Sequence, residues 1–87
     1  MPTLAFVDHD VLSPSPLVRP GIAMVQVHDE LWRLTRPDGD VLGYVERFSE
    51  PQGDRYRAKR LNAMRRRFLV LGEFWSFEDA LDCFGPN

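Results

Sequence analysis

Apolar residues fall into short runs separated by turn-forming residues, a pattern typical of a small antiparallel sheet. Residues 22–27 form a β-branched apolar run of strand length. Residues 31–36 and 41–48 flank the sequence Pro-Asp-Gly-Asp at 37–40, in which proline presets φ and glycine accepts a positive φ. These two flanking segments are therefore predicted to pair as a β-hairpin.

Two further breaks divide the middle of the chain. Residues 50–54 separate the hairpin from residues 55–61, and residues 62–64 can turn the chain again into the apolar run at 68–71. The pattern therefore predicts two more short strands after the hairpin, in a meander of antiparallel strands.

The basic segment has two interpretations. In a strand, Arg55, Arg57 and Lys59 would lie on one face about 6.6 Å apart, with Tyr56 and Ala58 on the other. In a helix, Asp54 would be the N-cap, Gly72 would follow the last turn, and one side would be apolar, with Leu61, Met64, Phe68 and Leu71. Propensity favours the helix. We favour strands because of the resemblance described below.

The last element is predicted to be a helix. Ser76 can serve as its N-cap, Asp79 stands in the capping-box position, and Gly85 followed by proline can end it. One apolar stripe, made of Phe77, Ala80, Leu81 and Phe84, has the helical spacing needed to lie on a sheet.

The first 20 residues are predicted to form an arm or linker. A short apolar run at 4–7 is followed by Ser-Pro-Ser-Pro at 13–16 and by Pro-Gly at 20–21, which favour extended chain and then a break. The expected fold class is α+β: a small antiparallel β-meander of three to four strands packed on one C-terminal α-helix, in a single domain over residues 21–87.

Charge is strongly segregated along the chain. Residues 55–67 hold seven of the eleven cations and no acidic residue, whereas residues 1–54 and 68–87 have net formal charges of −5 and −4. A basic surface suits an anionic partner, and nucleic acid is the commonest. Ten of the cations are arginine, which fits either bidentate phosphate recognition or a genome rich in G and C.

Composition narrows the class of protein. A chain of 87 residues that is 44% hydrophobic can form one small folded domain. Its one cysteine, Cys83, cannot form an internal disulfide, which fits the reducing cytoplasm, so a cytoplasmic location is expected. The side chain of Cys83 is expected to be a small buried hydrophobe. No export signal and no apolar run of membrane-spanning length is visible, so no membrane association is expected.

Three stretches match a known pattern: Gly-Asp-Arg-Tyr-Arg-Ala-Lys at 53–59, an irregular basic loop, and Phe-Leu-Val-Leu-Gly-Glu-Phe-Trp-Ser-Phe-Glu-Asp-Ala at 68–80 with Phe84. On these residues the chain resembles the plant AP2/ERF-type DNA-binding domain and the related arm-type N-terminal domains of tyrosine recombinases. It also resembles short proteins of high-GC Gram-positive bacteria, a likeness that implies no function.

The resemblance implies a three-stranded antiparallel sheet with one face on the helix and the other in the DNA major groove. Carried over by residue, Arg55, Arg57 and Lys59 would face DNA, Tyr56 and Ala58 would pack under Ala80 and Leu81, and Arg47 would match a basic position on the preceding strand. The chain departs from the family at Val70, where plant members have an aromatic residue, and at residues 43–47, which are poorer in arginine.

Two clusters of histidine and acidic residues suggest a metal or hydrolase site: residues 8–10 (Asp-His-Asp) and residues 28–30 (His-Asp-Glu). Imidazole and carboxylate groups do bind divalent metals, but the chain has no H-x-x-x-H spacing and no third cluster, so solvated surface positions are favoured. It also lacks a Gly-rich phosphate loop, a nucleophile elbow and a Cys/His pair. We therefore expect no metal, no cofactor and no enzymatic activity.

The sequence thus predicts a small nucleic-acid-binding protein, with DNA as the favoured target, that acts as an accessory or regulatory factor. The expected contacts, mostly to phosphates, come from Arg47, Arg55, Arg57, Lys59, Arg65, Arg66 and Arg67. Carboxylates paired with the strand cations would weaken this hypothesis, and unpaired cations would support it.

The alternative function is a protein-interaction adaptor. The basic strip would dock on an acidic protein, while the apolar face of Phe68 and Val70 or the edge of residues 22–27 pairs with that partner. A sheet edge would also allow a homodimer.

Overall fold

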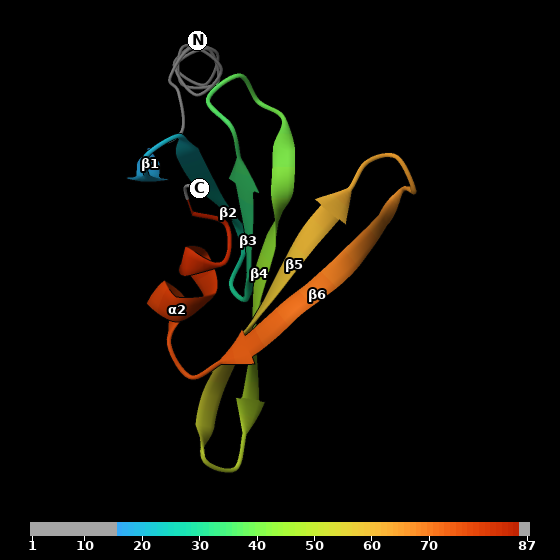
Figure 1. Cartoon of the computed structure of the whole chain (residues 1–87). Coiled ribbons are helices and arrows are strands. Elements are labelled where there is room, and N and C mark those ends of the chain that lie inside the picture. Colours follow the sequence, from blue (N-terminus) through green and yellow to red (C-terminus); the bar gives the residue numbers. More distant parts are fainter. Residues whose placement is uncertain (1–15, 86–87) are drawn as a thin grey trace, which may run out of the picture.

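The computed structural model describes residues 16–85, which form one antiparallel sheet and one short helix (Figure 1). The sheet has six strands in the order of the chain. They are β1 (Leu17–Arg19), β2 (Ile22–His28), β3 (Leu31–Thr35), β4 (Val41–Glu50), β5 (Gly53–Asn62) and β6 (Arg67–Phe74), and α2 (Phe77–Asp82) follows. The protein is thus mostly β with a small helix, and it has more strands than the three to four predicted.

The predicted hairpin is confirmed as β3 and β4. Its turn closes where the backbone N–H of Gly39 donates to the carbonyl of Arg36 at 2.9 Å, and the N–H of Arg36 donates to the carbonyl of Asp40 at 2.8 Å. Gly39 has a φ of 101°. Because side chains are rarely tolerated in that region, glycine is needed at this turn.

The basic segment forms two strands, and the single-helix interpretation is wrong. β5 and β6 pair in antiparallel register from Tyr56 opposite Phe74 to Asn62 opposite Arg67. Asn62 helps to form the turn between them, because its side-chain oxygen accepts a hydrogen bond from the N–H of Arg65 at 3.1 Å. Tertiary pairing therefore overrides the helix propensity of this segment.

The helix begins where the sequence predicts. The side chain of Ser76 accepts a hydrogen bond from the N–H of Asp79 at 3.0 Å, which satisfies one of the unpaired donors of the first turn. α2 lies on one face of the sheet (Figure 1). There its apolar stripe packs on the strands in one cluster of buried residues: Ile22, Leu34, Leu42, Val45, Ala58, Ala80, Leu81 and Phe84.

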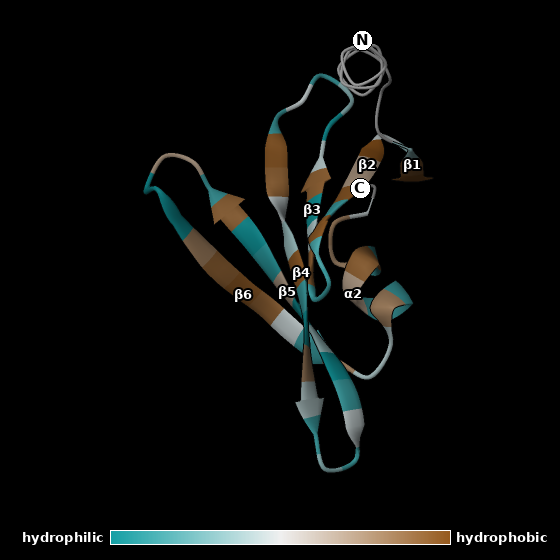
Figure 2. Ribbon diagram, turned by 180° about the vertical axis from the view of Figure 1, so that it is seen from behind, coloured by the Kyte–Doolittle hydropathy of each residue, from teal (hydrophilic) through white to brown (hydrophobic). Residues whose placement is uncertain are grey.

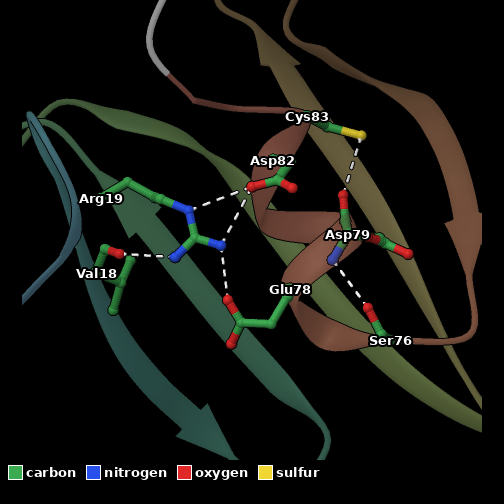
Figure 3. Close-up of polar contacts among 7 residues, drawn as sticks. All are labelled: Val18, Arg19, Ser76, Glu78, Asp79, Asp82 and Cys83. Atoms are coloured by element: carbon green, nitrogen blue, oxygen red, sulfur yellow. Dashed lines mark hydrogen bonds and ion pairs between the residues drawn. The ribbon is translucent and has the colours of Figure 1, made fainter.

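Residues 1–15, which include most of the predicted arm and the acidic cluster at 8–10, lie outside the described residues. The last residues assigned to the arm form β1, which pairs with β2. Arg19 in β1 forms ion pairs with Glu78 at 2.6 Å and Asp82 at 3.2 Å (Figure 3). Hydrogen bonds to these carboxylates raise the pKa of Arg19 above its ordinary value. These contacts join β1 to α2.

β2 occupies an interior position, because it pairs with β1 on one side and with β3 on the other. β1 covers only the start of this strand: Leu17 stands opposite Ala23, Arg19 stands opposite Ile22, and the N–H of Met24 donates to the carbonyl of Pro16. Within residues 16–85, residues 25–27 are unpaired on that side, so pairing with a partner there stays a prediction. Within residues 16–85, no helix has both the length and the apolar character needed to cross a lipid bilayer.

Cys83 packs against the core at the end of α2 and is partly buried. Its thiol lies 3.9 Å from the carbonyl oxygen of Asp79 (Figure 3). Burial, and then the nearby carboxylates of Asp82 and Asp79, raise the pKa of this thiol. Because a raised pKa disfavours the reactive thiolate, this environment fits the small hydrophobe expected from the sequence.

Candidate nucleic-acid interface

The strand cations lie on the sheet face opposite α2. In the register of β4 and β5, Arg57 stands opposite Glu46 and Lys59 opposite Tyr44, whereas Ala58 between them stands opposite the buried Val45. The alternation expected from the sequence is therefore present in β5, and it separates the cationic face from the core face.

Each of these cations is paired with a carboxylate. Arg57 lies 2.9 Å from Glu73 and 3.6 Å from Glu46. Lys59 lies 3.1 Å from Glu46. Arg55 lies 3.5 Å from Glu50. Partly exposed ion pairs contribute little to stability, but the carboxylates cancel the positive field that would attract an anion. This geometry weakens the prediction that the face binds phosphates.

Aromatic rings hold two of these guanidinium groups against the sheet. Arg55 lies 4.3 Å from the ring centre of Trp75, and Arg57 lies 4.5 Å from that of Phe48. Arg55 also donates a hydrogen bond to the carbonyl of Glu73 at 2.9 Å. A ligand would have to displace these contacts before it could engage both groups.

Arg47 lies on the other face of the sheet. It stands opposite Tyr56, whose ring packs on Phe77 of the helix. Its guanidinium lies 5.6 Å from the ring centre of Trp32 and donates to the carbonyl of Asp29 at 3.0 Å. The structure therefore does not bring Arg47 together with the cations of β5.

Within residues 16–85, five cations have side chains that make no ion pair and no hydrogen bond. They are Arg36, Arg60, Arg65, Arg66 and Arg67, all of them exposed, and we call this set the arginine end. Arg65 and Arg66 lie in the turn between β5 and β6, beside Met64, which is 95% exposed, and Arg67 begins β6. The basic strip thus divides into a paired half on β5 and an unpaired half at and beyond its end.

A cleft opens between the two hairpins of the arginine end. β4 and β5 are paired as far as Gly43 and Arg60, and beyond this point the β3–β4 and β5–β6 hairpins diverge (Figure 1). The cleft has a volume of about 420 Å³ and is lined by Arg36, Asp40, Val41 and Leu42 on one side and by Arg60, Leu61 and Ala63 on the other. An arginine from each hairpin therefore borders the same cavity.

A second cavity shares these two arginines. It has a volume of about 270 Å³ and lies toward α2, where it is lined by Pro20, Gly21, Ile22, Arg36, Leu42, Arg60 and Phe84. Ile22, Leu42 and Phe84 among these lining residues belong to the core, while the two guanidinium groups supply positive charge. Such an environment suits an anionic group more than a neutral or cationic one.

Gly43 determines how closely the strands approach at the base of the cleft. A Cβ atom at this position would lie 2.0 Å from the carbonyl oxygen of Lys59 and 2.8 Å from Cε1 of Phe84. Only glycine therefore allows β4 to approach β5 and the Phe84 ring this closely without a shift of the backbone.

The sequence interpretation missed Arg36 and Arg60 as site residues. Arg60 belongs to the basic strip, but it stands at an even position of β5, and even positions were assigned to the core face. The helix does not cover that last part of β5, so Arg60 is exposed. Arg36 follows β3, and no sequence pattern marks it as a site residue, because only the register of the folded hairpins brings it to the same cavity as Arg60.

His28 ends β2, and Asp29 and Glu30 form the turn between β2 and β3. Nδ1 of His28 accepts a hydrogen bond from the N–H of Glu30 at 3.3 Å. In the part of the chain that the structure describes, no three histidine, cysteine or acidic side chains are grouped to hold a metal ion.

Comparison with known proteins finds no family model, no curated protein and no solved structure that matches this chain. The resemblance to the AP2/ERF-type domain stays a prediction. The six-stranded sheet differs from the three strands that this resemblance implies.

Proposed function

We propose that the protein binds nucleic acid, with DNA as the favoured target, through the arginine end, and that it acts as an accessory or regulatory factor. The observation that supports this proposal is that, among the cations of residues 16–85, some are paired with carboxylates and others are not. Arg19, Arg55, Arg57 and Lys59 pair with carboxylates of the same chain, whereas the five cations of the arginine end do not.

Physical reasons favour an anionic polymer at this surface. Guanidinium groups that lack carboxylate partners repel one another, and a chain of phosphates would neutralise several of them at once. Each guanidinium can also donate two parallel hydrogen bonds to one phosphate. Asp38 and Asp40 lie on the β3–β4 turn near Arg36, so the β5–β6 turn is the more positive part of the surface and supplies most of the expected contacts.

The test is a fluorescence anisotropy titration of labelled duplex and single-stranded DNA at 50 mM salt. The triple variant Arg65→Gln, Arg66→Gln, Arg67→Gln should weaken binding by about a hundredfold, because each phosphate contact releases about one condensed counterion. The matched control, Arg55→Gln, Arg57→Gln, Lys59→Gln, removes the same formal charge and should weaken binding far less, since those cations are already paired.

Circular dichroism must first show that both variants fold. Wild-type protein that binds neither form of DNA would refute the proposal. If the control variant loses more affinity than the turn variant, the contacts lie on the open face of the sheet, as the resemblance implies, and the arginine end is the wrong surface.

A second candidate function is a protein-interaction adaptor, and the apolar surface of β6 favours it. Phe68 and Val70 are 46% and 57% exposed on the face that carries the cations of β5. An acidic, partly apolar protein segment would suit this face. A partner that stays bound after nuclease treatment and is lost with Val70→Lys supports the adaptor, whereas a partner that nuclease removes contradicts it.

A further inference from the structure

The outer edge of β6 is open within residues 16–85. β6 is the last strand of the sheet and pairs only with β5. It has eight residues, and Figure 2 shows a continuous hydrophobic stretch along it. A long apolar edge strand is a template for pairing with another strand, and folded proteins usually protect or cover such edges.

Apolar side chains are exposed on both sides of this strand. Phe68 stands opposite Leu61 and Val70 opposite Lys59, on the open face, while Leu69 stands opposite Arg60 on the face that carries α2. Residues Phe68, Leu69, Val70 and Leu71 are 46%, 48%, 57% and 39% exposed, and we call these four side chains with the open backbone edge the β6 edge. Met64 and Trp75, 95% and 54% exposed, extend the apolar surface at both ends.

The opposite edge of the sheet is protected where β1 forms it. β1 has only three residues, its register with β2 is irregular, and Arg19 within it is tied to α2 by two ion pairs. Short, irregular and charged edges resist pairing. β6 also has a register shift, between the pairs Ala58–Gly72 and Lys59–Val70, but it has no proline and no charge between Phe68 and Gly72, so the two edges of the sheet differ in length and charge.

We propose that the β6 edge pairs with the β6 edge of a second copy of this chain, antiparallel and about a two-fold axis. The order of charges along β6 is the reason to propose a second copy of this chain as the partner. β6 is preceded by Arg65 and Arg66 and starts at Arg67, its middle is apolar, and Glu73 stands near its end. Antiparallel pairing sets the cationic end of each copy near the acidic end of the other, whereas parallel pairing would oppose like charges.

A two-fold contact of this kind is self-complementary and closes after two molecules. It joins the two sheets into one, covers the open edge of both copies, and leaves the short β1 strands at the outside. The two arginine ends then point away from one another, so the dimer neither requires nor prevents nucleic-acid binding. The inference therefore stands independently of the proposed function.

The test is sedimentation velocity of the full chain from about 2 to 200 μM, in nuclease-treated protein. Wild type should shift from monomer to dimer as concentration rises. Leu69→Lys with Val70→Lys should remain monomeric over the whole range, since two buried ammonium groups at the edge oppose pairing. The control Val25→Lys with Val27→Lys changes two exposed valines on β2, which is separated from β6 by the three strands β3, β4 and β5, and should leave the dimer intact.

Hydrogen exchange on the wild type provides a second measurement that does not depend on any variant. Protection of the amides of β6 should increase with protein concentration, while that of β1 should not. Wild type that is monomeric at every concentration overturns the proposal. A dimer that persists in the β6 variant, or one that protects a different strand, overturns it as well.

Discussion

Gly43 is the single residue on which both the core and the cleft depend. It lies in β4 at the last pair before the hairpins diverge, opposite Arg60. Because the missing side chain lets Phe84 and the backbone of β5 approach, glycine here is needed for packing and not for an unusual φ.

Gly43→Ala should destabilise the protein by about 3 kcal/mol, at the upper end of the usual cost of overpacking, because the new methyl group meets a backbone oxygen that cannot rotate away. For a domain of this size, this loss corresponds to a fall in Tm of roughly 12 °C or more. Thermal denaturation followed by circular dichroism measures it.

Gly85→Ala is the matched control for that substitution. A Cβ atom at position 85 would lie no closer than 3.6 Å to the atoms around it, which is ordinary van der Waals contact. The control should melt close to wild type. An equal Tm for Gly43→Ala and wild type would show that the strands can separate at this point without cost.

Residue-scale patterns predict which face a side chain occupies, but not its partners. The alternation through β5 correctly separated Arg57 and Lys59 from Ala58. It could not show that Glu46 of the neighbouring strand accepts contacts from both cations, because that depends on the register of two strands. Arg47 lies on the helix side, the face of Val45 two residues earlier in β4, so its predicted contact with nucleic acid would come from the other face than that of the β5 cations.

Among the elements, the helix and the β3–β4 hairpin were predictable because their signals are local. A capping serine, an apolar stripe and a Pro-Asp-Gly turn act within a few residues. β1 was not predicted, because three residues between two prolines carry no strand pattern of their own and pair only in the presence of β2.

Ser76→Ala should destabilise the fold by about 1 kcal/mol, because it removes the acceptor of the N–H of Asp79. Urea denaturation should show this loss as a lower midpoint with an unchanged slope. Ser76→Asp retains an acceptor at the N-cap and adds favourable charge at the start of the helix, so it should stay within about 0.5 kcal/mol of wild type. Equal losses for both variants would show that the cap does not stabilise α2.

At the scale of the whole molecule, the sequence predicted a basic strip but not its division. In the folded sheet, carboxylates of β4 and β6 balance the cations Arg55, Arg57 and Lys59 of β5. Within residues 16–85, the cations of the arginine end have no such partners, so positive charge is concentrated there. Only the folded sheet brings these three strands together.

The salt dependence of DNA binding measures how many cations remain available. If the five arginines of the arginine end each contact a phosphate of duplex DNA, log K should fall with log salt at a slope of about −4.5. A slope near −7 would mean that the strand cations leave their carboxylates and join the contact. A slope near zero would contradict an electrostatic interface altogether.

The order of the strands has a consequence for how the chain folds. Every strand pairs with its neighbour in the sequence, so each step of sheet formation closes only a short loop. The contacts of Arg19 with Glu78 and Asp82 are different, because they join residues 59 and 63 positions apart. Hairpins of this kind can form in microseconds, and the docking of α2 against β1 is then the one event that must wait for nearly the whole chain.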